Sequence, residues 1–540
     1  MSTIQQLLTE HLDIWTAADT AKKTGRGRSS SNANKVYGIK KLRELILELA
    51  VRGKLVPQDP DDEPASELLK RMQKEKAKLV AEGKIKKEKP LTPISDEEKP
   101  FELPKGWEWL RLGDIYTFEY GENLPADKRS NSGEYPVYGS NGIVGSHNTC
   151  FVDSSCIVIG RKGSAGALNL SLAKGCCVTD VAYYCIPPKY LDLTFSFKLF
   201  HTLKLDVLGK GIKPGLSRNE AYVLLIAIPP FTEQRRIVAK IDELMTICDQ
   251  LETQHNNTAE IHKKLVSHFL GALMQSQSAE EFNKNWQRIA THFDILFTTE
   301  SSIDVLKQTL LQLAVMGKLV PQDPNDEPAS ELLKRILKEK TKLIAEGKTK
   351  KEKPLSLISE KEKLFELPTG WEWLRLGDIY SFEYGDNLPA DKRSSSGEYP
   401  VYGSNGIVGS HNTCFIDAPC IVIGRKGSAG ALNLSLAKGC CVTDVAYYCI
   451  PSKYLDLIFS FKLFHTLKLD VLGKGIKPGL SRNEAYVLLI AIPPFSEQRR
   501  IVTKIDELML LCDQLNSYIT KKNKLQQKIA NVLVEQTLLI

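Results

Sequence analysis

Hydrophobic positions along this chain follow two periods that alternate from one segment to the next. Near the N-terminus Ile39, Leu42, Ile46 and Leu49 recur at steps of three and four. This spacing predicts one buried face of a helix, and Gly53 suits the end of that helix.

From residue 107 to residue 230 the apolar positions instead form short runs rich in β-branched and aromatic residues. The clearest runs cover residues 156–159, 177–179 and 181–186, and Gly, Ser and Asn separate them. Such runs predict a mixed, mainly β domain with several loops, and one helix is expected at 193–205.

After this domain the helical period returns in a narrower form. Thr232 suits the N-cap of a helix, with Glu233 favourably placed in the first turn. Apolar residues then alternate steps of four and three, which is typical of a coiled-coil seam. The first seam is Ile237, Ile241, Leu244, Cys248 and Leu251, and the second is Ile501, Ile505, Leu508, Cys512 and Leu515, continuing through Ile519 and Leu525. About 40 helical residues at about 1.5 Å each would reach roughly 60 Å, which suits a rigid spacer.

The chain repeats itself at a constant distance. Trp107 returns as Trp371 and Arg218 as Arg482, and both pairs are 264 residues apart (371 − 107 = 482 − 218 = 264). Residues 156–187 reappear at 420–451 without a change, loops included. Exposed loops normally drift fastest, so two equal modules suit a ligand with two equal halves, such as an inverted-repeat DNA site. The region 253–300 has no obvious second copy, and its expected equivalents are divided between the two ends of the chain.

Composition limits the possible class of protein only slightly. The 540 residues exceed what one core supports, and the net charge of +7 is compatible with a polyanionic ligand without indicating one. The 12 cysteines lack Cys-x-x-Cys spacing, so we expect buried thiols in a reducing compartment. We find neither a secretory signal nor a membrane span, and we therefore expect a cytoplasmic protein that makes no contact with a membrane. The features of the chain given below lead us to expect a prokaryotic protein.

The sharpest candidate site is a glycine-rich basic loop at residues 160–166. Arg161, Lys162 and Ser164 lie in this loop, directly after a predicted strand. Arg and Lys can reach phosphates, or O6 and N7 of guanine in the major groove, and the alternative is an ordinary basic hairpin. The pattern is not a P-loop, because the required Gly-Lys-Ser/Thr end is missing.

Two further loops are weaker candidates. Residues 210–219 contain Lys213, Ser217 and Arg218, and Arg218 could equally contact DNA or cap a neighbouring helix. Asn141 stands before Gly142, which is chiefly a turn signal, with a base contact as the lesser alternative. The candidate DNA-binding residues of the second copy are Arg425, Lys426, Ser428, Lys477, Ser481, Arg482 and Asn405.

Searches for catalytic and metal-binding motifs return nothing that fits. Pro229-Pro230-Phe231 resembles the base-binding motif of amino-methyltransferases, but Ile228 stands where that motif needs a hydrogen-bond acceptor. The acidic run at 59–63 lies in a proline-rich turn, which favours a solvated turn over a nuclease site. We therefore predict neither a catalytic nor a metal site in this chain.

The ordered motifs resemble the specificity subunit of type I restriction-modification enzymes. Ile-Gly-Arg-Lys-Gly-Ser-Ala-Gly, Gly-Leu-Ser-Arg and Ile-Pro-Pro-Phe-Thr-Glu-Gln-Arg-Arg-Ile-Val occur in order before a coiled-coil helix, and the set occurs twice with few changes. Residues 37–45 and 55–60 are similar to the IB branch of that family.

The resemblance implies an α+β fold. Two β-rich target-recognition domains would be separated by two long antiparallel coiled-coil helices, with a pseudo-two-fold internal repeat. The expected divisions are 1–106 (N-terminal helices and basic linker), 107–230 (first recognition domain), 231–275 (central coiled-coil helix), 276–370 (helical connector and linker), 371–494 (second recognition domain) and 495–540 (C-terminal coiled-coil helix).

The resemblance also implies a DNA reader without catalysis of its own. Each domain would read half of a bipartite site on double-stranded DNA, and the helices would dock two methyltransferase subunits. S-adenosylmethionine, ATP and Mg²⁺ would belong to these and to restriction and translocation subunits. Family members typically carry two different recognition domains, whereas here they are almost the same, so we expect a palindromic site.

Two other functions remain open on the sequence alone. A fused methyltransferase or nuclease would transfer methyl groups or cut DNA without partners. A coiled-coil interaction scaffold would leave the repeated basic loops unexplained.

Overall fold

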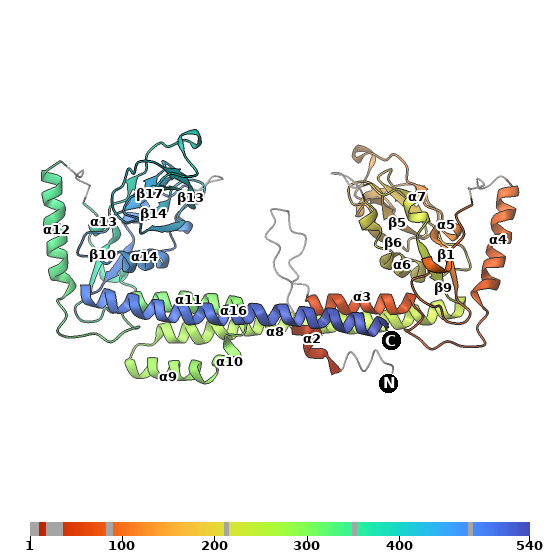
Figure 1. Ribbon diagram of the computed structural model, residues 1–540, viewed down its shortest axis with the longest axis horizontal. Helices are drawn as coiled ribbons and strands as arrows, with labels where there is room; N and C mark the ends of the chain where they lie inside the picture. The colour runs from red at the N-terminus through yellow and green to blue at the C-terminus, as the bar shows by residue number, and fades with distance from the viewer. Residues whose placement is uncertain are drawn as a thin grey trace. The chain divides into compact units, whose positions relative to one another are not determined.

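The computed structural model of the chain describes residues 10–17, 36–82, 90–209, 215–347, 354–473 and 479–539. These residues form two compact units. The first unit consists of Met1–Ala259 and Lys522–Ile540, and the second consists of Glu260–Lys521. The first unit therefore includes the C-terminal segment of the chain beside its N-terminal helices, and each unit is described below by itself (Figure 1).

The N-terminal helices of the first unit follow the predicted pattern. They are α2 (Leu12–Ala17), α3 (Tyr37–Val51) and α4 (Ala65–Ala81), followed by the 3-10 turn η1 (Asp96–Glu98). The four apolar positions predicted from the spacing are all buried in α3. Gly53 adopts a φ of 68°, and the amide of Lys54 donates to the carbonyl of Leu49 at 2.9 Å. A left-handed residue of this kind closes the last turn of a helix, as predicted.

Three small sheets build the β-rich part of the first unit. Strand β1 (Glu108–Arg111) pairs antiparallel with β9 (Leu225–Ile228), so the two ends of the domain meet. The second sheet has four strands in the order β2, β8, β5, β6, and the third has three in the order β4, β3, β7. Their bounds are β2 (Glu119–Tyr120), β3 (Tyr135–Gly139), β4 (Gly142–His147), β5 (Cys156–Gly160), β6 (Leu168–Ser171), β7 (Cys177–Val178) and β8 (Ala182–Cys185).

Every residue of the central strand β5 is buried, which explains its uninterrupted apolar run. Short helical elements connect the strands of this domain. They are α5 (Leu112–Ile115), η2 (Ala126–Lys128), α6 (Leu193–Thr202), η3 (Leu205–Leu208) and α7 (Arg218–Tyr222).

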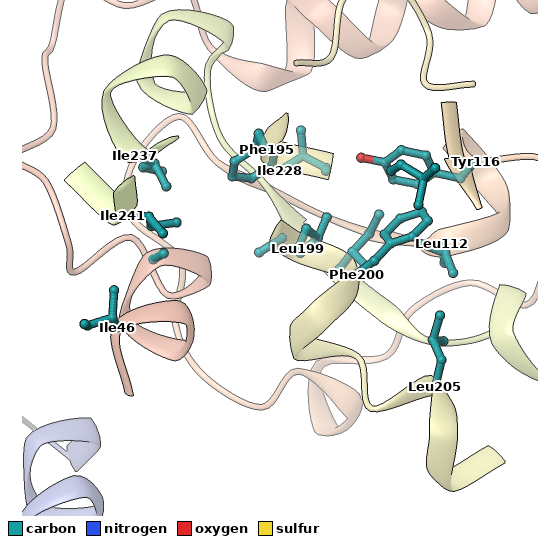
Figure 2. Packing of buried hydrophobic residues seen from close by; sticks show 14 of the residues in the cluster. Ile46, Leu112, Tyr116, Phe195, Leu199, Phe200, Leu205, Ile228, Ile237 and Ile241 are labelled. Atoms are coloured by element: carbon teal, nitrogen blue, oxygen red, sulfur yellow. The ribbon is translucent and has the colours of Figure 1, made fainter. Parts of the chain in front are cut away.

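Helix α6 joins the sheets to the long helices within one continuous core. Phe200 on α6 is fully buried, and its ring centroid lies 4.9 Å from that of Tyr116. The Tyr116 hydroxyl hydrogen-bonds the Ser196 hydroxyl at 2.8 Å, so the buried polar group is satisfied. Figure 2 shows this packing, and the same core includes Ile237 and Ile241 of the following helix. Each such side chain contributes about 1.5–3 kcal/mol on burial.

The long helix α8 (Phe231–Gln275) begins one residue before the predicted cap. Thr232 is therefore not the N-cap, and its hydroxyl instead hydrogen-bonds the Asp62 side chain. Glu233 is buried at 1% exposure, where its carboxylate accepts from Trp107 Nε1 at 3.0 Å and from Gln58 Nε2 at 2.8 Å. Burial raises the pKa of Glu233, and the hydrogen bonds from Gln58 and Trp107 oppose the rise.

The second unit repeats this plan. Its helices before the sheets are α9 (Ala279–Thr291), α10 (Phe293–Leu296), α11 (Glu300–Val315) and α12 (Ala329–Ala345), followed by η4 (Glu360–Glu362). Its strands are β10 (Glu372–Arg375), β11 (Glu383–Tyr384), β12 (Tyr399–Gly403), β13 (Gly406–His411), β14 (Cys420–Gly424), β15 (Leu432–Ser435), β16 (Cys441–Val442), β17 (Ala446–Cys449) and β18 (Leu489–Ile492).

The sheets of the second unit have the same strand orders as those of the first. The connecting elements also recur, as α13 (Leu376–Ile379), η5 (Ala390–Lys392), α14 (Leu457–Thr466), η6 (Leu469–Leu472) and α15 (Arg482–Tyr486), and α16 (Phe495–Leu539) follows.

Each unit completes its helical layer with the end of a long helix. In the first unit the C-terminal segment of α16 contacts α3, where the Tyr37 hydroxyl donates to Asn531 Oδ1 at 2.8 Å. In the second unit the end of α8 packs against α11, and the Lys318 ammonium donates to the carbonyl of Ser276 at 2.7 Å. The predicted seam extension to Leu525 is wrong, because that side chain is 58% exposed.

Candidate nucleic-acid interface

The loop after strand β5 is held in a defined shape by its own backbone. The amides of Arg161 and Lys162 both donate to the carbonyl of Val181, at 2.9 and 3.0 Å. Gly166 adopts a φ of 75°, and a Cβ there would lie 2.2 Å from the amide nitrogen of Asp206. Only glycine fits such a close approach, so Gly166 has a structural role in the shape of this loop.

The second predicted loop lies directly against the first. The amide of Leu216 donates to the carbonyl of Arg161 at 2.8 Å, and the Tyr183 hydroxyl donates to the carbonyl of Leu216 at 3.1 Å. Lys162 and Gly215 form an isolated antiparallel bridge. The structure therefore brings together Arg161 and Arg218, which are 57 residues apart in the sequence (218 − 161 = 57).

The third predicted loop also lies beside the loop of residues 160–166. A Cβ added at Gly160 would lie 2.4 Å from the carbonyl oxygen of Ser140. Asn141, the next residue, is exposed in the turn between β3 and β4. Ser164 is partly buried and Ser217 is exposed, while Lys213 and Lys477 lie outside the described residues.

Both arginines lie close to an aromatic side chain that the sequence pattern did not reveal. The guanidinium carbon of Arg161 lies 4.9 Å from the centroid of the Tyr120 ring, and that of Arg218 lies 5.0 Å from the same centroid. Tyr120 is 48% exposed. Each cation–π contact of an exposed pair contributes about 0.5–1 kcal/mol, which counters the repulsion between the two like charges.

Both arginines are further fixed through backbone carbonyls. Arg161 donates from one terminal nitrogen to the carbonyl of Asp180 at 2.8 Å, and Arg218 donates to the carbonyl of Phe118 at 3.3 Å. A guanidinium has five N–H donors, so one such bond leaves most of its donor capacity for a ligand.

Lys162 differs from the arginines. Its ammonium lies 3.8 Å from the Asp180 carboxylate, and both side chains are about half exposed. Surface ion pairs of this kind contribute about 0–1 kcal/mol, so the lysine can exchange this partner for another anion. Burial raises the pKa of the adjacent Tyr183 phenol, Tyr120 adds to the rise, and the arginines oppose it. The phenol thus stays a donor toward the second loop.

The second unit contains the same arrangement. Arg425 and Arg482 lie 4.9 and 5.2 Å from the Tyr384 centroid, and Lys426 lies 3.7 Å from the Asp444 carboxylate. The other predicted residues take equivalent places, with Asn405 and Ser481 exposed and Ser428 partly buried. The two units thus present one basic, aromatic-centred surface each.

The proline motif before α8 has a structural role. Ile228 is fully buried and pairs with Glu108 at the end of β9. Gln234 Nε2 donates to the carbonyl of Pro229 at 3.1 Å, which secures the junction between strand and helix. The missing hydrogen-bond acceptor and the burial of Ile228 argue against a base-binding role for this motif.

The predicted seam residues pack inside their own units. The buried ones are Ile237, Ile241, Leu244, Cys248, Ile501, Ile505 and Cys512, while Leu251, Leu508 and Leu515 are partly buried. Their side chains contact helices and sheets of this chain, so a partner would meet other side chains of the helices.

The remaining observations concern metals, cysteines and membranes. The described residues bring together no group of three His, Cys, Asp or Glu side chains that fits a metal ion. All 12 cysteines are free thiols, and ten of them are buried. Within the described ranges every helix is too short or too polar to cross a membrane.

Comparisons with known proteins agree with this architecture. The model of the type I restriction modification DNA specificity domain matches residues 104–261 and again residues 368–527. The EcoAI type I restriction enzyme specificity subunit of Escherichia coli is 39% identical, over 98% of this chain and 99% of that protein. The EcoEI specificity subunit of the same organism is 37% identical, over 99% and 100%.

The chain therefore belongs to the type I restriction-modification specificity subunits, and its role is DNA sequence specificity. Its fold combines helices with two repeated sheet-rich domains and a long helix at 231–275.

Solved structures add only a distant likeness. A chain from a study of complex assembly and conformational transition of the type I R-M system is 16% identical, with a TM-score of 0.49 over 81% of this chain and 99% of that one. The HsdS subunit from Thermoanaerobacter tengcongensis is also 16% identical, with a TM-score of 0.36 over 81% and 97%.

Proposed function

We propose that the domains at 107–230 and 371–494 each read one half of a bipartite, palindromic site on double-stranded DNA. The observation that supports this most directly is the repetition of one basic cluster, since Arg161, Arg218 and Tyr120 recur as Arg425, Arg482 and Tyr384 with matching distances. Two domains with the same surface should recognise the same half-site sequence. If they face opposite strands, the second word is the reverse complement of the first.

The proposed reading combines two kinds of contact. The arginines, held by carbonyls and an aromatic ring, suit guanine edges in the major groove, where two parallel hydrogen bonds discriminate by about 1–3 kcal/mol. The exposed Lys162 and Lys426 suit phosphates, which position the domain without reading sequence. Asn141, Ser164 and Ser217 are proposed as further polar contacts from the same loops, as are their copies Asn405, Ser428 and Ser481.

The proposal assigns no chemical step to this chain. Methyl transfer with S-adenosylmethionine, and cleavage and translocation with ATP and Mg²⁺, would belong to two methyltransferase subunits docked on the helices and to restriction subunits. The chain would then act in the prokaryotic cytoplasm, where these partners meet host DNA. The buried Ile228 in the methyltransferase-like motif supports this division of labour.

Mapping the methylated adenines in a host genome that carries this system tests the proposal. We expect one short word and its reverse complement, separated by a gap of fixed length. Two unrelated half-sites would contradict the palindromic reading. In addition, the purified chain incubated with labelled S-adenosylmethionine and DNA should transfer no methyl group until methyltransferase subunits are added.

A further inference from the structure

The most informative feature outside the predicted site residues is the exposed Tyr120 and its copy Tyr384. Two guanidinium groups from separate loops approach one ring within 5.0 Å in the first unit and 5.2 Å in the second. Among the described residues, no carboxylate forms an ion pair with either of the first unit's two arginines, and the nearby Asp180 carboxylate is paired with Lys162. The Tyr120 ring thus makes cation–π contacts with both arginines, and neither arginine has a carboxylate partner among the described residues.

The ring position is itself secured by the fold. Tyr120 ends strand β2, which pairs with β8 so that Tyr120 stands opposite Tyr183. The two rings lie 5.1 Å apart in an edge-on arrangement. Phe118, just before β2, donates its amide to the Tyr222 hydroxyl at 2.7 Å, which ties the start of β2 to the last residue of helix α7, the helix that Arg218 begins. These contacts fix Tyr120 relative to both arginine-bearing loops.

The guanidinium carbons of Arg161 and Arg218 lie 4.9 and 5.0 Å from the Tyr120 ring centroid, and a guanidinium can contact a ring through its face. Its N–H groups lie in the plane of the group and stay available at the edge. Reading a base edge requires donors in a fixed plane, whereas a phosphate accepts a charge from many directions. The arrangement therefore fits base acceptors better than phosphates.

We propose that Tyr120 and Tyr384 are positioning residues that determine specificity, each holding two arginines so that their edges meet the N7 and O6 acceptors of guanine in one half-site. This inference rests on the proposed function. It adds a residue that touches the reading arginines and sets their orientation.

Tyr120→Leu in the full-length chain tests the inference, with the unchanged Tyr384 as the internal control. Each variant is assembled with its methyltransferase subunits and mixed with a randomised pool of DNA duplexes, and the bound duplexes are sequenced. We expect the preference for guanine to fall about tenfold or more at one or two positions of one half-site. The other half-site should keep its wild-type preference.

Two further variants separate positioning from a general structural effect. Tyr120→Phe keeps the ring and should retain wild-type preferences. Arg161→Lys keeps the charge but loses the planar fork, so it should reproduce the loss seen with Tyr120→Leu at the same half-site. The thermal unfolding midpoints of Tyr120→Phe and Arg161→Lys should match the wild type. If Tyr120→Leu fails to fold, wild-type base preferences in Arg161→Lys would by themselves overturn the inference, because the ring would then hold no base-reading fork.

Three outcomes would overturn the inference. Unchanged base preferences in Tyr120→Leu and Arg161→Lys would show that the ring does not position a reader. An equal loss of affinity for all duplexes, with a shallower salt dependence, would assign the arginines to phosphates. Equal losses in both half-sites would exclude a local effect. By contrast, a wild-type complex without any sequence preference would contradict the proposed function itself.

Discussion

The two units agree at the recognition loops and differ in their helical layers. In the first unit the Arg43 guanidinium contacts Asp249 at 2.6 Å and Glu252 at 2.8 Å. At the equivalent place of the second unit, Lys307 contacts Asp513 at 2.5 Å, and Asn516 replaces the second carboxylate. The loops keep every candidate DNA-binding residue, whereas in the helices Lys307 stands in place of Arg43 and Asn516 in place of Glu252. The helical layer of the second unit thus has one ion pair fewer at this place, whereas the candidate DNA-binding loops of the two units have the same side chains.

The largest expected effect concerns the cores that the two units share. Phe200→Ala and Phe464→Ala each remove a fully buried ring at equivalent positions and should each lower the free energy of unfolding by about 3–5 kcal/mol. Denaturant unfolding of both variants measures this. Costs that differ by more than 1 kcal/mol would show that the repeated cores are not equivalent in energy.

The junctions before the long helices should be the next most sensitive. Glu233→Ala leaves the Trp107 indole N–H without its acceptor and removes one acceptor of the Gln58 amide, which keeps the carbonyl of Gly53. Glu497→Ala affects Trp371 and Gln322 in the same way. Each change should cost about 1–3 kcal/mol of unfolding free energy.

The pH dependence of this junction has a defined sign. Burial raises the pKa of Glu233 above the ordinary value of 4.5, so the folded chain holds this proton more tightly than the unfolded chain does. The resulting stabilisation is fully present below pH 4.5 and is lost as the pH rises through the raised pKa. Relative to Glu233→Gln, the wild type should therefore lose stability as the pH rises through that range. A relative gain would contradict the raised pKa.

Single arginine substitutions test the agreement at the loops. Arg161→Ala should weaken recognition of one half-site by about 1–3 kcal/mol, and Arg425→Ala should weaken the other by the same amount. Binding is measured with duplexes in which one half-site at a time is scrambled. A loss for all sequences alike would assign the residue to phosphate contact, and no loss would remove the loop from the interface.

The smallest expected effect sharpens the contrast between the helical layers. Arg43→Ala removes a cation with two carboxylate partners and should cost about 1 kcal/mol, whereas Lys307→Ala removes a single pair and should cost only a few tenths. Thermal unfolding of both variants at low salt measures the difference. A larger cost at Lys307 would show that the second unit did not lose an interaction.

The sequence predicted the elements that depend on local period, but it missed contacts between distant residues. The spacing of Ile39, Leu42, Ile46 and Leu49 was enough to place α3, because one apolar face defines a packed helix. Thr232 was misassigned because α8 begins at Phe231, and its hydroxyl hydrogen-bonds Asp62, 170 residues away, instead of capping the helix. No local pattern reveals such a competitor.

The candidate site likewise combines residues that local patterns reveal with a residue that only the tertiary structure places there. Glycines and basic residues identified the loops of Arg161 and Arg218, but Tyr120 carries no signal of its own and acquires its place through the pairing of β2 with β8. The exposed Leu525 continues a helical spacing without lying on a packed face. Periodicity identifies a face of a helix, and only the tertiary arrangement decides whether another element covers it.

The most direct test is a structure of the chain with its methyltransferase subunits on a duplex carrying the mapped site. The account predicts that Arg161 and Arg218 contact one half-site, and that Arg425 and Arg482 make the same contacts in the other half-site on the opposite strand. Arginines turned away from the DNA, or two domains that read in the same direction along the duplex, would contradict it.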